Sequence, residues 1–164
     1  MELLCERAAK KGYRIFLLGA GPGVAANAAK NLEQRYPGFQ CVGTYSPPMG
    51  FEKDPKEMEK IISMLKESQA DQLFVGMGSP KQDIFIYENM QKYQIPVSYS
   101  MGAALDFIGG SVKRAPKWMC DHGLEWLHRC MTNPKRLVKR YVEDLRIFSY
   151  YRKFRRQEKK AGRL

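Results

Sequence analysis

The chain has 164 residues, enough for one domain of ordinary size, and 44% of them are hydrophobic, which is enough for a buried core. The net charge of +11 is uneven: residues 1–112 carry 12 Lys and Arg against 12 Asp and Glu, whereas residues 113–164 carry 16 against 5. No stretch approaches the ~18 uninterrupted apolar residues of a membrane span, and the charged residues 1–11 lack the apolar centre of a secretory signal.

Short apolar runs alternate with helix-like stretches over the first two thirds of the chain. Helices are predicted over residues 2–11, 22–35, 55–69 and 81–92, and strands over residues 13–18, 39–44, 72–75 and 97–101. In the first helix Leu3, Leu4 and Ala8 are expected to face inward, with Cys5 as a further candidate. The alternation predicts an α/β fold, with a Rossmann-like and mostly parallel sheet flanked by helices.

Three of the predicted strands end in turns of small residues, at 19–23, 76–78 and 102–104. Ligands of open parallel sheets bind beyond the carboxyl ends of the strands, so these turns indicate a site there. After the second turn Ser79 is expected to cap a helix and Pro80 to occupy its first turn. Such a helix start favours an anion, toward which Lys81 and Gln82 would project. The alternative is a capped strand-to-helix turn with a surface lysine.

The first turn does not fit the dinucleotide fingerprint. The third glycine of GxGxxG falls on Val24, and no acidic residue ends the second strand, so NAD binding is disfavoured. The turn also lacks the Gly-Lys-Ser/Thr of a P-loop, whereas a nucleotide diphosphate on its backbone amides remains open. The four cysteines and two histidines have no common ligand spacing, so neither a metal site nor a cofactor is expected. Asp106 is interpreted as a helix cap, with a ligand-facing carboxylate as the alternative.

Residues 113–164 differ in character from what precedes them. Helical sequence surrounds residues 123–129, and Pro134 is predicted to open a long basic helix with aromatic residues on its apolar stripe. This pattern favours an anionic surface such as a membrane leaflet or a lipid pyrophosphate, and the alternative is a helix that docks on the domain with a solvated basic face. Nucleic acid is not an expected partner, because no RRM, KH or helix-turn-helix signature is present. Trp118 and Trp126 are expected to serve core or interfacial packing rather than to stack on a ligand.

Several motifs, taken together and in their order along the chain, are typical of one family of proteins. They are Phe16-Leu17-Leu18-Gly19, Pro22-Gly23-Val24-Ala25, Gly76-Met77-Gly78-Ser79-Pro80-Lys81-Gln82, Gly102-Ala103-Ala104-Leu105-Asp106-Phe107, Lys113-Arg114-Ala115-Pro116-Lys117-Trp118 and Gly123-Leu124-Glu125-Trp126-Leu127-His128-Arg129. In this order, over nearly the whole chain, they resemble the WecG/TagA/CpsF glycosyltransferase family.

The resemblance implies a Rossmann-like enzyme at the cytoplasmic face of the bacterial membrane, acting without an obligatory metal. It would transfer N-acetylmannosamine, or its uronic acid, from a UDP-sugar to N-acetylglucosamine on undecaprenyl pyrophosphate, with inversion, for teichoic acid or another surface polysaccharide. Expected donor-site residues are Gly19, Gly21, Gly23, Gly76, Gly78, Ser79, Pro80, Lys81 and Gln82. Expected pyrophosphate contacts are Arg114, Arg129, Arg136 and Arg140. Residues 1–112 would form the donor-binding body, and residues 113–164 a basic appendage.

One departure from the family concerns the catalytic base. Members of the family carry a further N-terminal segment, with early strands and the aspartate proposed as the catalytic base. No residue of this sequence matches that aspartate, so Asp106 is left as a candidate for the base. The chain would then be a fragment, a protein with a misassigned start, or one completed by a partner. We expect little sugar transfer from it alone and a tendency to form homo-oligomers. The alternative function is a non-catalytic nucleotide- or membrane-binding module.

Overall fold

A computed structural model describes residues 1–113, 115–132 and 145–160. Its contacts divide the chain into two units, Met1–Lys113 and Arg114–Leu164. In the first unit the strands are β1 (Arg14–Gly19), β2 (Gln40–Tyr45), β3 (Gln72–Gly76) and β4 (Val97–Ser100). The helices are α1 (Glu2–Lys11), α2 (Val24–Arg35), α3 (Pro55–Glu67), α4 (Lys81–Tyr93) and α5 (Ala104–Ile108), with a 3₁₀ turn, η1, at Phe51–Lys53.

The four strands form one parallel sheet in the order β2-β1-β3-β4, which confirms the predicted fold class. β1 and β3 are central, and residues 15–19 and 73–76 are buried along their whole length. A central parallel strand is covered on both faces, which explains why Ile15 to Leu18 is an unbroken apolar run. Full burial of a side chain such as Leu17 or Phe74 contributes about 1.5–3 kcal/mol.

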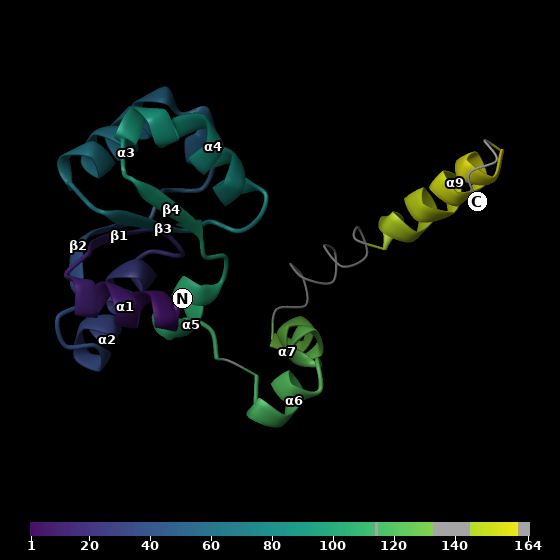
Figure 1. Cartoon of the computed structure of the whole chain (residues 1–164), viewed down its shortest axis with the longest axis horizontal. Coiled ribbons are helices and arrows are strands. Elements are labelled where there is room, and N and C mark those ends of the chain that lie inside the picture. The colour runs from purple at the N-terminus through teal and green to yellow at the C-terminus, as the bar shows by residue number, and fades with distance from the viewer. Residues whose placement is uncertain (114, 133–144, 161–164) are drawn as a thin grey trace. The chain divides into compact units, whose positions relative to one another are not determined.

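Helices cover both faces of the sheet (Figure 1). Residues of α1, α2 and α5 pack on one face, where the alanines of α2 and the thiol-bearing Cys5 contribute to the core. Residues of η1, α3 and α4 pack on the other face, around Ile61, Leu65 and Phe85. The expectation for Leu3 is wrong: its side chain is 81% exposed, and Cys5 and Ala8 are the buried residues of α1. At the helical angle Leu3 lies on the solvent side once Cys5 and Ala8 face the sheet.

Helix α3 shows how the sequence sets an element boundary. The Asp54 carboxylate accepts hydrogen bonds from the N–H groups of Lys56 at 3.0 Å and Glu57 at 3.4 Å, and Pro55 occupies the first helical position. An acidic N-cap followed by proline suits the unpaired amides at a helix start. This cap fixes the end of the long connection that leaves β2.

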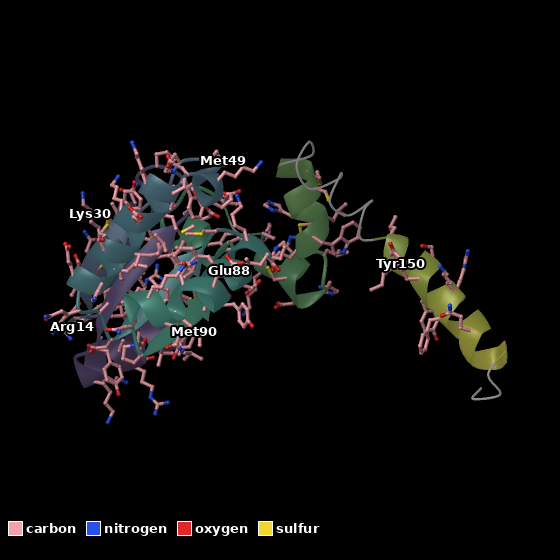
Figure 2. The ribbon with its side chains drawn as sticks, turned by 90° about the horizontal axis from the view of Figure 1, so that it is seen from above. Arg14, Lys30, Met49, Glu88, Met90 and Tyr150 are labelled. Carbon is pink, nitrogen blue, oxygen red and sulfur yellow. The ribbon has the colours of Figure 1, made fainter. Side chains whose placement is uncertain are left out.

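The second unit contains α6 (Lys117–Asp121), α7 (Glu125–Thr132) and α9 (Arg146–Lys160). Trp118 and Trp126 are 60% and 51% exposed, so neither is a core residue, and their expected role in interfacial packing stays a prediction. On α9 the aromatic side chains are also exposed, and Figure 2 shows Tyr150 standing out from the helix. The predicted helix start at Pro134 lies outside the described residues. None of the described helices is both long and apolar enough to cross a membrane.

Candidate functional site at the carboxyl ends of the strands

The point where the strand order reverses lies between β1 and β3. The chain leaves β1 toward β2 on one side and returns to β3 on the other. In open parallel sheets this is where ligands bind, beyond the carboxyl ends of the strands. The turns 19–23 and 76–82 both begin there, directly after the last residues of β1 and β3.

The two turns are in close contact. Gly19 has φ +112°, and a Cβ on it would lie 2.5 Å from the carbonyl oxygen of Gly76, so only glycine fits. The N–H of Ala20 donates to the same oxygen at 2.7 Å. The close approach of the two backbones therefore joins the first and second turns into one structure.

Several backbone amides of these turns have no partner within the protein. Among the described residues, none accepts a hydrogen bond from the N–H groups of Gly21, Gly23, Gly78 or Ser79. Gly23 is the N-terminal flank of α2 and Gly78 lies just before α4, with φ values of +77° and +80°. Unpaired amides beside two helix starts suit a phosphate or diphosphate group.

Ser79 and Pro80 do not occupy the predicted capping positions. Helix α4 begins at Lys81, Pro80 is its N-cap residue, and no side chain makes a cap hydrogen bond there. The first turn is closed instead by backbone bonds, from Gln82 to Gly78 at 3.0 Å and from Asp83 to Pro80 at 3.1 Å. The Ser79 cap expectation is thus wrong, because the helix starts one residue later than that cap requires.

Lys81 lies against the connection that follows β2. Its ammonium is 2.8 Å from Glu52 Oε1 and 5.7 Å from the ring centre of Phe51. The hydrogen bond from Lys81 lowers the pKa of the Glu52 carboxyl. In this structure Lys81 therefore holds η1 against α4, and its charge is shared with a carboxylate.

Gln82 connects the second turn to the third. The side chain is only 6% exposed, and its Oε1 accepts a hydrogen bond from the N–H of Gly102 at 3.0 Å. Its Nε2 group has no partner among the described residues. The amide is thus fixed on its acceptor side, and its donor side is available to a ligand.

Two carboxylates at this edge, those of Asp106 and Asp83, each accept a hydrogen bond from a serine. Asp106 is inside α5, whose N-cap is Ala103, so the cap interpretation is wrong. Its Oδ1 accepts from the Ser111 hydroxyl at 3.2 Å, and its carbonyl accepts from the N–H of Ser111 at 3.0 Å. Asp83, in the first turn of α4, accepts a hydrogen bond from Ser100 at the end of β4. Sequence patterns had not singled out Asp83 and Ser100 as a pair.

Ser46 is another residue that sequence reasoning missed. It follows the last residue of β2, and its hydroxyl lies 3.1 Å from the Gly19 carbonyl oxygen and 3.0 Å from that of Gly21. The available signal was its position: like the glycine turns, it comes directly after a strand of the same parallel sheet.

The described residues do not test the expected pyrophosphate contacts. Arg114, Arg136 and Arg140 lie outside the described residues, and Arg129 is on α7 without a described side chain. Within residues 1–113, 115–132 and 145–160, no group of three or more His, Cys, Asp and Glu side chains is arranged to hold a metal ion.

Comparison with known proteins adds to this geometry. Residues 1–161 match the sequence profile of the Glycosyl transferase WecG/TagA/CpsF family. The chain is 33% identical over 133 residues to an N-acetylglucosaminyldiphosphoundecaprenol N-acetyl-beta-D-mannosaminyltransferase of Bacillus spizizenii. That match covers 81% of this chain and 49% of the relative, so the chain spans about half the length of the curated protein it matches.

Proposed function

Because this chain belongs to the WecG/TagA/CpsF family of glycosyl transferases, we propose that it binds a UDP-sugar and serves hexosyl transfer in cell-surface polysaccharide synthesis. The donor is UDP-N-acetylmannosamine or its uronic acid. The acceptor is N-acetylglucosamine on undecaprenyl diphosphate, as the name of the Bacillus relative suggests. The carrying observation is the set of unpaired amides of Gly21, Gly23, Gly78 and Ser79 at the reversal of the strand order.

The proposed reaction is an inverting displacement. A hydroxyl oxygen of the acceptor attacks the anomeric carbon, the bond from that carbon to UDP breaks, and a carboxylate takes the hydroxyl proton. Negative charge develops on the diphosphate as it leaves, so amides already oriented toward it stabilise the transition state. The backbone amides of the 19–23 and 76–82 turns would stabilise the leaving diphosphate in this way, and the Gln82 Nε2 group supplies one more hydrogen-bond donor.

UDP binding is the first test of the proposal. Calorimetry with UDP, UDP-N-acetylglucosamine and NAD should show preference for the UDP ligands. Gln82→Glu keeps an oxygen for the N–H of Gly102 but replaces the Nε2 donor by a charge, so UDP affinity should fall about tenfold or more. Gln91→Glu makes the same chemical change at an exposed site on α4 and serves as the control. Preference for NAD, or equal UDP affinity in both variants, contradicts the donor site.

Catalysis is tested separately. Transfer from UDP-N-acetylmannosamine to a short-chain lipid-diphosphate N-acetylglucosamine should be weak or absent in the 164-residue chain, because no residue of it matches the aspartate proposed as the base of the family. Robust turnover that falls about 10²–10⁴-fold in Asp106→Asn would instead identify Asp106 as the base. UDP binding without transfer would fit a nucleotide-binding module.

Residues 114–164 are proposed to bring this site to the cytoplasmic surface of the plasma membrane. Exposed aromatic side chains of α9, including Phe148, Tyr151 and Phe154, alternate with basic ones, among them Arg152, Lys153 and Arg155. Aromatic and cationic side chains on one helix suit an anionic leaflet. The arginines 114, 129, 136 and 140 remain proposed contacts of the acceptor diphosphate.

A further inference from the structure

The hydroxyl of Ser46 faces two carbonyl groups of the first glycine turn at the same time. Its Oγ is 3.1 Å from the Gly19 oxygen and 3.0 Å from the Gly21 oxygen. A serine hydroxyl has one proton to donate, so the two carbonyls share it in a three-centre arrangement. One side chain from the β2 connection thereby contacts the turn at two places.

These two contacts fix the orientation of two peptide planes. In a trans peptide the C=O of one residue and the N–H of the next point in opposite directions. The Gly19 carbonyl points to Ser46, and accordingly the N–H of Ala20 points away from it, toward the Gly76 oxygen at 2.7 Å. The Gly21 carbonyl is held by Ser46 and also accepts from Val24 at 3.0 Å.

The peptide between these two planes carries the N–H of Gly21. That N–H has no acceptor among the described residues. Ala20, on one side of this peptide, has φ +58°, a conformation that L-residues adopt rarely without support. With both flanking planes held, the Gly21 amide keeps one direction without a partner of its own.

Ser46 is itself firmly placed. Tyr45, the last residue of β2, has its hydroxyl bound between Glu57 and the Lys60 ammonium, with the Lys60 nitrogen 2.6 Å from the tyrosine oxygen. On the other side Pro47 restricts the backbone of Ser46 to extended conformations. The hydroxyl therefore reaches the turn from a residue anchored on both sides.

We propose that Ser46 is a positioning residue for the donor diphosphate: its hydroxyl holds the Gly19 and Gly21 carbonyls so that the Gly21 amide is oriented for a phosphate oxygen before the ligand arrives. The proposal rests on the proposed function, because it assigns the role to the UDP-sugar site. Ser46 does not touch the reacting atoms; it acts through the backbone of the turn, and its loss lowers affinity by leaving the turn with more than one conformation.

The experiment compares UDP binding by the full chain and three variants. Ser46→Ala should weaken binding roughly three- to tenfold, the range expected for one shared hydrogen bond, and Ser46→Thr, which keeps a hydroxyl, should restore most of it. Ser68→Ala is the matched control, since Ser68 Oγ also donates to a carbonyl, that of Leu65 at 2.6 Å, but lies before β3 at the opposite edge of the sheet. It should leave UDP affinity unchanged.

A second readout follows the amide itself. In ¹H–¹⁵N spectra UDP should shift the Gly21 resonance of the wild-type chain, and Ser46→Ala should move or broaden that resonance without ligand. If Ser46→Ala does not fold, Ser46→Cys gives the same comparison with a weaker donor. No UDP binding by the wild-type chain overturns the donor site and this role with it. UDP binding with equal affinity in Ser46→Ala and an unchanged Gly21 resonance overturns the role of Ser46 alone.

Discussion

The two units of the chain differ in where their apolar side chains lie. In residues 1–113 most of the apolar residues of the strands are buried between two layers of helices, and 13 Lys and Arg nearly balance 12 Asp and Glu. In the described residues of the second unit Ala115 and Met119 are buried, whereas the large apolar side chains of α9 are more than half exposed and the net charge is strongly positive. The first unit buries most of its large apolar side chains, although Leu3, Met49 and Tyr87 are exposed, whereas α9 exposes all of those that lie on it. Exposed apolar patches of this kind usually mark a surface that meets a partner.

The largest expected effect concerns that exposed surface. Removal of residues 134–164 should lower binding to vesicles with anionic lipid by at least about tenfold, because each Lys or Arg near such a surface contributes about 1 kcal/mol. Co-sedimentation at low and high salt measures it, and neutral vesicles are the control. Equal binding by the full and shortened chains at low salt would remove the distinction between the units.

The reactivity of the cysteines provides a second comparison of burial in the two units. Burial raises the pKa of the Cys5 and Cys41 thiols to about 11, so at pH 8 only about one thiol in a thousand is ionised. Cys5 is fully buried, whereas Cys120 and Cys130 in the second unit are partly exposed, as is Cys41 in the first. Iodoacetamide at pH 8 should therefore label Cys120 and Cys130 several-fold faster than Cys5, which is buried, as read by peptide mass spectrometry. Labelling of Cys5 at a similar rate would show that the core of the first unit opens readily.

Within the first unit, two glycines allow an effect on ligand binding to be distinguished from an effect on stability. Gly23 lies in the proposed donor turn, and Gly12 follows α1, away from that turn. Gly23 and Gly12 have φ values of +77° and +70°, and no atom lies within 4 Å of a Cβ added to either. Alanine should cost each about 1–2 kcal/mol of stability, from the left-handed backbone. Gly23→Ala alone should also weaken UDP binding, by roughly tenfold, because its methyl group lies beside the unpaired amide. Thermal unfolding measures the stability of both variants, and calorimetry measures their affinity for UDP. Equal UDP affinity of Gly23→Ala and Gly12→Ala would mean that the ligand binds away from Gly23.

The smallest effect is electrostatic. Arg14 hydrogen-bonds Asp71 through its side chain and its backbone N–H, and these bonds lower the pKa of the Asp71 carboxyl in the folded chain. The pair therefore stabilises the fold above the unfolded-state pKa of ~4, and this contribution is lost as pH falls through the folded-state pKa. Asp71→Asn should cost about 0.2–1 kcal/mol at pH 7 and nothing near pH 2, by urea unfolding. An equal cost at both pH values would contradict the ion pair.

The sequence by itself determined the elements, their type and the end of the strands at which the glycine turns lie. Unbroken apolar runs such as Ile15–Leu18 indicate buried parallel strands, and glycine after a strand indicates a turn, because both signals are local. The predicted boundaries agree with the structure to within two residues for most elements of the first unit. The family followed from motifs read in order, and the profile match confirms it.

Only the tertiary structure decided which side chains meet. Gln82 with Gly102, Lys81 with Glu52, and Ser46 with Gly19 and Gly21 are pairs separated by 20 residues or more, brought together by the order of the strands. The helix cap assigned to Ser79 was wrong because α4 starts one residue later than that cap requires, and the cap assigned to Asp106 was wrong because α5 starts at Ala104, which places Asp106 inside the helix. Local patterns indicate the type of each element, whereas the contacts between residues far apart in the sequence depend on the order and connections of the strands.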